Sequence, residues 1–553
     1  MRYLSGGFLF PCGLLVTQVL ASALPSSHNG LNALVQRDGN ASWLLPVPTQ
    51  DPWYSPPSDW ETKSPGSPLR VRYSPYRNIS IGACVDTFQV LYRTTDTNSN
   101  ASWAVTTVFI PESQLNCTAT SPEKCSHGVV TYEVPYDSAD PDATPSYLLQ
   151  YGEPYGEIYE LLKRGWFVNT PDYEGPLASY CAGVQSGHAT IDSIRAILQV
   201  SEDFGLNHSV ARNAIWGYSG GAMASEYSAE LVGAYAPDLK LAGIVHGGLI
   251  PNVTSAGNKM TSKDTAGLAI AGIIGITSQQ TEARKYIDSR LKTSGPFNKT
   301  LFYTATQYSG AQVLGAFENQ NVSDYFYNGT SDLDVPIMND IYYNDAIMGH
   351  HGVPNMPVFV YKAIHDEMSA AAETDALVDS FCSQGANILY HRNDVGGHNE
   401  ELWQGRGRAL AFLSDVLDDT DLISMPKTGC SILNVTVAVN VTLVDGTSLE
   451  GTVEKPYAAI TVNGINVTVL GNGSVLVPYN GTLIRIDPDP TTSVKRRSGD
   501  LDFVGLVRRW WGAIRSKWAR DEEVDQRVAE LRNSLDVLGA AEGLASKGWF
   551  TTG

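Results

Sequence analysis

This chain is short of positive charge, of cysteine and of long apolar runs, and each shortage excludes a class of function. Among its 553 residues, 38 lysines and arginines stand against 58 acidic residues, and the formal charge of −20 argues against nucleic acid as a partner. Its seven cysteines include no Cys-x-x-Cys pair, and no two histidines stand at a zinc-binding spacing, so no metal or other cofactor is expected. No apolar run reaches the roughly 18 residues typical of a membrane-spanning helix.

The amino end has the pattern of a secretory signal. Arg2 supplies positive charge, residues 8–20 form a short apolar run, and Ala21-Ser22-Ala23 ends it with small residues. Residues 1–23 are therefore predicted to be a signal peptide and the mature protein to be extracellular. Six cysteines remain after Cys12 of the signal; an oxidising compartment favours disulfides among them, with fifteen pairings open. An array of N-glycosylation sequons favours the same compartment. It includes the sequons at Asn40, Asn78, Asn100, Asn207, Asn252, Asn298, Asn321, Asn434, Asn466 and Asn480.

The central part of the chain alternates between strand and helix patterns. Residues 24–49 are polar with scattered leucines and are interpreted as a propeptide. Residues 50–432 predict an α/β fold with a mostly parallel sheet covered by helices on both faces. Its predicted strands are 88–92, 103–110, 129–134, 166–169, 213–216, 241–245, 358–364 and 387–391. Residues 252–345 interrupt this rhythm with the apolar run 266–276, which is either a plain core helix or part of a cap over a hydrophobic site.

The carboxyl-terminal part has a different character. Residues 433–487 predict a small β-rich appendage, in which Asn463-Gly464 is a strong hairpin signal. Its predicted strands are 435–443, 458–462, 465–470 and 475–479. Residues 488–553 predict an amphipathic helical tail, which either contacts an anionic lipid surface or docks on protein. Lys495-Arg496-Arg497 is alternatively a processing site that removes the tail.

Gly217-Tyr218-Ser219-Gly220-Gly221 has the form of a nucleophile elbow. A strand is predicted just before it and a helix over residues 222–231 just after it. Small residues on both sides of the serine let the backbone turn sharply enough to expose its hydroxyl. The pentapeptide alone is common, so a base and an acid must support it.

A serine hydroxyl is a poor nucleophile without a histidine to take its proton. Six histidines follow Ser219, at positions 246, 350, 351, 365, 391 and 398. His398 lies in a loop after the strand 387–391 and before a helix predicted over residues 400–416. This position suits an imidazole that reaches across the sheet edge, so His398 is the predicted base.

The acid is expected after the strand that precedes the histidine. Residues 358–364 run directly into His365, Asp366 and Glu367, and Asp366 is the first choice. Glu367 and Asp375 remain weaker alternatives because they lie further along the chain.

An oxyanion hole needs two N–H donors near the serine. One is expected from Gly220, the residue after the nucleophile, and the other from the loop that begins at Pro135-Tyr136-Asp137.

With these residues in place, the chain resembles the fungal secretory lipases, the lipase A type of α/β-hydrolase, over about residues 50–432. The resemblance implies Ser219 as nucleophile, Asp366 as acid and His398 as base, with Gly220 and Asp137 as oxyanion residues. It is carried by Asp51-Pro52-Trp53-Tyr54-Ser55-Pro56-Pro57, the stretches 90–95, 217–221, 236–237, 246–248 and 363–367, and the segment from Cys382 to His398.

The resemblance also implies a helical lid over residues 252–345 and a disulfide between Cys382 and Cys430. The family's second disulfide, which reaches the lid, has no counterpart because no cysteine lies between Cys181 and Cys382. The remaining four cysteines must pair in another way, and Cys84–Cys181 with Cys117–Cys125 is one arrangement that stays open.

The leading hypothesis is a secreted serine ester hydrolase that forms an acyl-enzyme and acts on lipid esters, foremost triacylglycerols, at an oil–water interface. A soluble short-chain esterase, an acyltransferase or a serine peptidase of the same fold is the alternative within enzymes. A surface or cell-wall binding protein with an inert hydrolase body is the alternative outside them.

Overall fold

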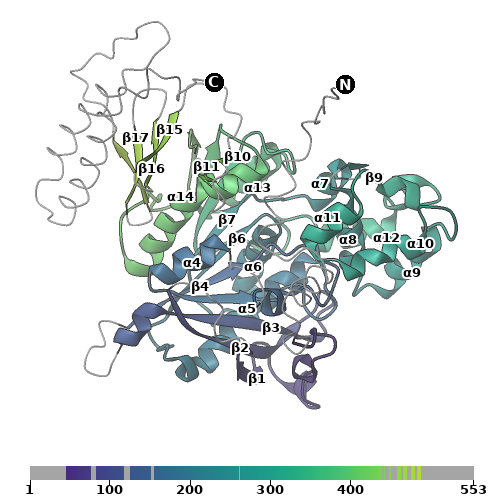
Figure 1. The fold of residues 1–553 in the computed structure, drawn as a ribbon, viewed down its shortest axis with the longest axis horizontal. Coiled ribbons are helices and arrows are strands. Elements are labelled where there is room, and N and C mark those ends of the chain that lie inside the picture. Colours follow the sequence, from purple (N-terminus) through teal and green to yellow (C-terminus); the bar gives the residue numbers. More distant parts are fainter. Residues whose placement is uncertain are drawn as a thin grey trace, which may run out of the picture.

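The computed structural model describes residues 45–75, 83–117, 125–150, 155–260, 262–263 and 265–438, and six short strands between residues 441 and 486 (Figure 1). The predicted signal peptide, residues 24–44 of the predicted propeptide, the Asn463-Gly464 turn and the predicted tail 488–553 lie outside these residues. Within the described part of the chain, no helix is both long and apolar enough to cross a membrane.

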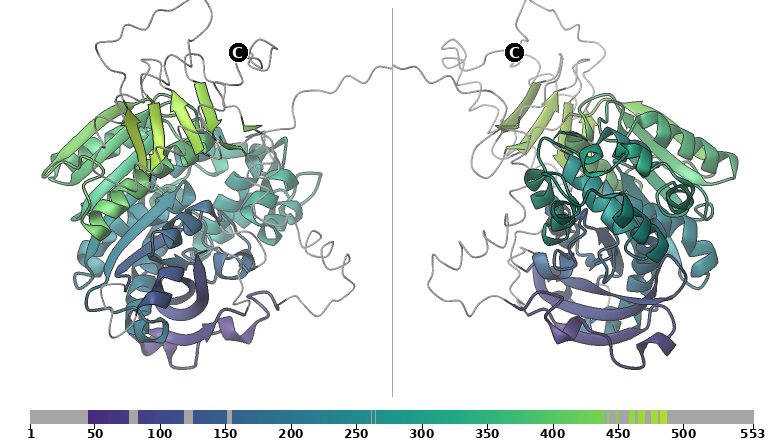
Figure 2. Two further views of the ribbon diagram at one scale, coloured as in Figure 1. Left: turned by 60° about the vertical axis from the view of Figure 1, so that its left-hand side comes forward. Right: turned by 90° about the vertical axis from the view of Figure 1, so that its right-hand side faces the viewer.

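A ten-stranded sheet forms the body, in the order β1-β2-β3-β5-β4-β6-β7-β10-β11-β12 (Figures 1 and 2). The pairs β1/β2, β2/β3 and β3/β5 are antiparallel, and every pair from β5 to β12 is parallel. The predicted α/β-hydrolase fold is confirmed, and each predicted strand of the central part lies in this sheet. The strands are Pro68–Tyr73 (β1), Cys84–Thr95 (β2), Ala101–Pro111 (β3), Gly128–Glu133 (β4), Phe167–Pro171 (β5), Arg212–Tyr218 (β6), Leu241–Gly247 (β7), Pro357–Ala363 (β10), Asn387–Asn393 (β11) and Cys430–Val435 (β12).

Helices cover both faces because the chain between two parallel strands must return over a face of the sheet, usually as a helix. One face carries α4 (Gly156–Lys163) and α14 (His398–Asp418). The other carries α5 (Gly183–Gln199), α6 (Gly220–Tyr235) and α13 (Ala371–Ser383). The single turn α3 (Pro145–Leu148) lies beside β3 and β5.

Strand β10 shows how the sheet separates two cores. Phe359 and Tyr361 pack with α14, whereas Val358 and Val360 pack with α13, as the two-residue period of a strand requires. A strand buried on both faces is expected to be apolar throughout, yet Lys362 follows in the same strand and is fully buried. This lysine needs a partner inside the protein.

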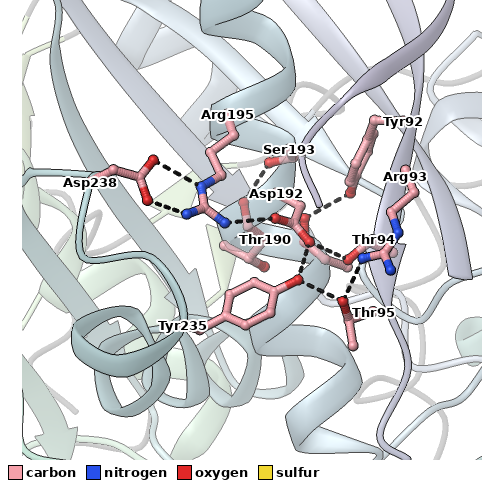
Figure 3. A network of polar contacts seen from close by, with 12 residues as sticks. Tyr92, Arg93, Thr94, Thr95, Thr190, Asp192, Ser193, Arg195, Tyr235 and Asp238 are labelled. Carbon is pink, nitrogen blue, oxygen red and sulfur yellow. Dashed lines mark hydrogen bonds and ion pairs between the residues drawn. The ribbon is translucent and has the colours of Figure 1, made fainter. Parts of the chain in front are cut away.

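A buried polar network fastens α5 and the end of α6 to β2 (Figure 3). Asp192 of α5 accepts hydrogen bonds from Tyr235 of α6 at 2.6 Å and from Thr94 of β2 at 2.9 Å. Arg195 joins the same carboxylate to Asp238 in the turn after α6. Burial raises the pKa of Asp192 to about 6, although these donors oppose it. The network holds α6, which begins at the elbow, in place at its far end.

Between β7 and β10 the chain forms a helical insertion, residues 253–345, beside the sheet (Figures 1 and 2). Ile270 and Ile274 of its apolar helix pack with Phe302, Phe317 and Tyr325 in a core of the insertion's own. The run 266–276 is therefore a core helix of the insertion. The elements are α7 (Val253–Lys259), β8 (Ser262–Lys263), α8 (Ala266–Ile276), α9 (Thr281–Arg290), α10 (Lys299–Tyr303), α11 (Gly310–Ala316), β9 (Gln320–Asn321) and α12 (Pro336–Asp345).

The main sheet extends beyond the predicted boundary at residue 432. The strand predicted over residues 435–443 is interrupted: β12 ends at Val435 and pairs in parallel with β11, residues 436–438 lie outside any strand, and Val441–Thr442 form β13. Further on, β15 and β16 pair antiparallel on either side of residues 463–464. The strands of this part are Val441–Thr442 (β13), Ser448–Leu449 (β14), Ala458–Val462 (β15), Ile465–Val469 (β16), Val475–Tyr479 (β17) and Thr482–Ile486 (β18).

Two disulfides and two free thiols account for the cysteines of the described residues. Cys382 of α13 is bonded to Cys430 of β12, and Cys117 to Cys125. The Cys84–Cys181 pairing is wrong, since both are free thiols. Cys84 starts β2 and packs against the sheet core, whereas Cys181 is buried in the core of the insertion, so the two belong to different parts of the molecule.

Candidate active site

Ser219 stands at a sharp turn between β6 and α6. Its backbone has φ 55° and ψ −120°, a left-handed conformation that costs energy for a residue with a side chain. The neighbouring glycines are required by contact: a Cβ on Gly217 would lie 2.0 Å from the Gly221 carbonyl oxygen, and one on Gly221 would lie 2.0 Å from the Glu133 carbonyl oxygen. The elbow therefore has this geometry because its flanking residues have no side chains.

The structure brings Ser219, His398 and Asp366 into one chain of contacts. His398 Nε2 lies 2.8 Å from Ser219 Oγ, and His398 Nδ1 lies 2.7 Å from Asp366 Oδ2. An ionised carboxylate can only accept, so Nδ1 carries the hydrogen and Nε2 accepts from the serine hydroxyl. Asp366 and His398 are buried, whereas Ser219 is half-exposed.

The Asp366 carboxylate has a donor for each of its four acceptor positions. Oδ1 accepts from the N–H groups of Met368 and Ser369, both at 2.9 Å. Oδ2 accepts from His398 and from Lys362 Nζ, the latter at 2.7 Å. Burial alone raises the pKa of Asp366, but His398 and Lys362 outweigh it and hold the pKa below its ordinary value. Asp366 is therefore an ionised, fully bonded carboxylate.

His398 is also held by its backbone. It is the first residue of α14, which begins there and not at the predicted residue 400. Its N–H donates to Glu367 Oε2 at 2.9 Å, and the N–H of Gly397 donates to Glu400 Oε2 at 2.9 Å. Carboxylates at a helix N-terminus bind free N–H groups and favour the helix dipole. Tyr218 completes the setting by donating its hydroxyl to the His398 carbonyl oxygen.

Asp137 lies directly against the first residue of α6. A Cβ on Gly220 would stand 1.9 Å from Asp137 Oδ1, and that oxygen is shielded from solvent without a hydrogen-bond partner. Burial raises the pKa of Asp137 to about 6, against an opposing effect of His398. The two predicted oxyanion residues are therefore side by side, next to Ser219.

The helical insertion touches this oxyanion loop. Ser138 Oγ donates to the Tyr308 carbonyl oxygen at 3.0 Å, and Ala139 packs in the insertion's core. Gly310, the first residue of α11, fits so closely that a Cβ would lie 2.5 Å from the Tyr136 carbonyl oxygen. The position of α11 and the position of the oxyanion loop are therefore linked.

Further buried acids surround the ends of β4 and β5. Burial is the main cause that raises the pKa of Asp172 to about 7 and the pKa values of Glu133 and Glu174 well above their ordinary range. A group whose pKa is raised on folding contributes stability that is present below its unfolded value and is lost as pH rises through its folded value.

The protein is accordingly expected to be more stable near pH 5 than near pH 8, with the loss from Asp172 beginning near its unfolded pKa of about 4 and complete once the pH has risen through about 7. The difference should be on the order of a few kcal/mol, or a few degrees in Tm. Thermal unfolding across this range measures it. Asp172→Asn should flatten part of the slope, whereas a Tm that rises steadily toward pH 8 contradicts the expectation.

Four of the histidines passed over contact other groups. His391 is buried on β11, where burial lowers its pKa to about 3. His350 stacks on Tyr343, and His351 lies against the Asn344 carbonyl oxygen. His246 is buried 2.8 Å from Ser225 Oγ, a second serine–histidine pair with no exposure to solvent. Within the described residues, no group of three or more His, Cys, Asp or Glu is placed to hold a metal ion.

The roles of two residues of the site were missed from the sequence. Lys362 had a usable signal, since a charge inside a buried parallel strand requires a partner and Asp366 follows four residues later. Glu367 was considered as an alternative acid, but the structure places its carboxylate on the backbone of His398 and not on its ring.

Comparison with known proteins identifies the family. Residues 149–425, half of the chain, match the family model described as secretory lipase. The chain belongs to the secretory lipase family. The trichothecene C-3 esterase of Fusarium sporotrichioides is 40% identical over 399 residues, which cover 70% of this chain and 88% of that protein. Lipase A of Arthroderma benhamiae is 33% identical over 395 residues, which cover 67% and 80%.

Among solved structures, that of Candida antarctica lipase A matches with a TM-score of 0.61 at 27% identity, over 71% of this chain and 90% of that one. The resemblance stated from the sequence is confirmed. Since the relatives are lipases and esterases, this member of the secretory lipase family is a secreted ester hydrolase.

Proposed function

We propose that Ser219, His398 and Asp366 form the catalytic triad of this ester hydrolase. The observation that carries the proposal is the unbroken contact from Ser219 Oγ through the His398 ring to Asp366. Ser219 Oγ attacks the ester carbonyl carbon while His398 Nε2 takes its proton. The protonated His398 then gives that proton to the departing alcohol, which leaves an acyl group on Ser219. Asp366 holds the ring and stabilises its positive charge.

Water completes the cycle in the same site. His398 removes a proton from a water molecule, whose oxygen attacks the acyl carbon and forms a second tetrahedral intermediate. The proton returns to Ser219 Oγ as the bond to the acyl group breaks, and a carboxylic acid leaves. An acyltransferase would use an alcohol in place of this water.

Gly220 and Asp137 are the proposed oxyanion residues. Gly220 opens a sixteen-residue helix, so its N–H has no partner within the helix and lies at the positive end of the dipole. Asp137 lies against it, and with a pKa of about 6 its carboxyl carries a proton under mildly acidic conditions. A protonated carboxyl can donate to a developing oxyanion, whereas an ionised one repels it.

The proposed substrates are apolar esters, and two classes have specific support. Triacylglycerols at an oil–water interface are favoured by family membership and by the lipases among the relatives. A trichothecene ester is favoured by the 40% identity to a trichothecene C-3 esterase. Helices α7 to α12 are the proposed lid over the site.

We further propose that residues 1–23 are the signal peptide that directs secretion, and that the carboxyl-terminal tail contacts lipid surfaces.

Two measurements test this proposal. A fluorophosphonate should label the folded protein at Ser219, and an unlabelled Ser219 refutes the triad and favours the binding-protein alternative. Turnover of triacylglycerol emulsions, short soluble esters and a trichothecene C-3 ester then separates the substrate classes. Activation at the oil surface supports the lipase, and its absence with fast turnover of the trichothecene ester supports the esterase.

The contact between α11 and the oxyanion loop gives a testable pair of glycines. Gly310→Ala is expected to lower kcat/KM about tenfold, because its Cβ pushes against the Tyr136 carbonyl oxygen and displaces the loop that carries Asp137. Gly315→Ala in the same helix meets nothing within 4 Å and should leave activity unchanged while slightly stabilising the helix. Equal activity of the two variants contradicts the linkage.

A further inference from the structure

Lys362 is a charged side chain inside a buried strand, and no step of the mechanism above uses it. It is 0% exposed, and its Nζ lies 2.7 Å from Asp366 Oδ2 and 2.8 Å from the Leu249 carbonyl oxygen. Burying an ammonium group is unfavourable unless the group is well paired, and an apolar residue would pack in such a strand without that cost. The position therefore calls for a reason beyond packing.

Lys362 and His398 share one oxygen atom. Asp366 Oδ2 accepts from both, on the side opposite the two backbone donors to Oδ1. A carboxylate beside an imidazole favours the protonated ring, and a cation bound to the same carboxylate offsets that effect. The bond from Lys362 to Leu249 also ties the acid's strand to the loop after β7, immediately before α7.

We infer that Lys362 is a positioning residue of the proposed triad: its ammonium fixes the Asp366 carboxylate and offsets part of its charge, so that His398 releases its proton and acts as a base at lower pH. The inference rests on the proposed function, because Lys362 acts through Asp366 and His398. It deepens that function by assigning a residue that sets the pH range of the reaction.

The other charges near these groups do not replace the ammonium. Glu373 of α13 and Lys259 of α7 both act on Lys362, with opposite signs. Three other carboxyls lie near Asp366 or His398, and when ionised they favour the protonated ring: Glu367 at the His398 N–H, Glu401 of α14 and Asp137 beside Gly220. Arg408 pairs with Glu401, and Tyr218 lies against the His398 ring with its hydroxyl bonded to the His398 carbonyl oxygen. Asp137 titrates in the same pH range, so the test compares variants that all retain it.

Lys362→Met and Lys362→Gln test the inference through the rate of fluorophosphonate labelling at pH 4.5 to 9. Both variants should move the acid limb of the profile upward by about one pH unit, which is about tenfold slower labelling on the acid side. The plateau should change by no more than about threefold. Glutamine keeps donors for Asp366 and Leu249 without the charge, so a shift in both variants assigns the effect to charge. An unmoved limb in both folded variants overturns the inference.

The outcomes separate this inference from the proposed function. If the unsubstituted chain is not labelled at Ser219, the proposed triad fails. If it is labelled and the variants keep its acid limb, only the role of Lys362 fails. If neither variant folds, Lys362→Arg decides, because it keeps the positive charge: an acid limb within about 0.3 pH unit of the parent supports the inference, and a limb moved by about one unit overturns it.

Discussion

Replacing Ser219 with alanine is expected to lower kcat by about four to six orders of magnitude while the protein remains folded. The hydroxyl that His398 contacts is lost, and no other group lies in its place to form the acyl-enzyme. Residual hydrolysis should come from the oxyanion donors alone. Turnover of a soluble ester measures the loss, and mass spectrometry after fluorophosphonate treatment should show no adduct.

Ser225→Ala is the matched control for this prediction. Ser225 lies on the same helix and is also 2.8 Å from a histidine, His246, whose Nε2 lies 2.9 Å from Glu226. This second set is buried, so no ester can reach it, and its loss should leave turnover within about threefold of the parent. If turnover survives Ser219→Ala but is abolished by Ser225→Ala, Ser225 is the nucleophile and the proposed triad is refuted.

Replacing Asp366 with asparagine is expected to have two large effects at once. Turnover should fall by about three to four orders of magnitude, because an amide cannot hold the ring in the same tautomer or stabilise its charge. The free energy of unfolding should also fall by about 3–5 kcal/mol, because Lys362 is left buried beside a neutral group. Ester hydrolysis and denaturant unfolding measure the two effects separately.

The double variant Lys362→Met/Asp366→Asn separates these effects. Removing both charges should restore most of the lost stability, because no unpaired ion remains in the interior. Activity should stay at the level of Asp366→Asn. If the double variant loses as much free energy of unfolding as the two single variants added together, the two side chains do not form an energetically coupled pair.

Local patterns predicted much of the fold and the site. β10 was predictable because residues 358–361 form the apolar run expected of a parallel strand buried on both faces, and the strand leads directly to Asp366. His398 was predictable because the site of this fold gathers at the carboxyl ends of the strands. Both arguments need only the chain near each residue.

What failed depended on distant parts of the chain. The Cys84–Cys181 pairing came from elimination among cysteines, and only the packed structure shows that Cys181 is buried with the insertion. The end of the sheet was misplaced because the alternation of residues 435–443 does not reveal that β12 pairs with β11. The contact between Lys362 and Asp366 depends on the turn after β10, which brings the carboxylate back to its own strand.

The bond between Cys382 and Cys430 has a mechanical consequence for everything that follows it in the chain. A pull on the carboxyl-terminal segment would reach the body at β12, where strand pairing with β11 resists it. Even if that strand peeled away, extension would stop at Cys430, and the load would pass through the sulfur atoms to α13 on the flank of the sheet. The elbow on β6 lies beyond β11, β10 and β7 from this anchor. A tether at this end could therefore hold the protein without transmitting strain to Ser219.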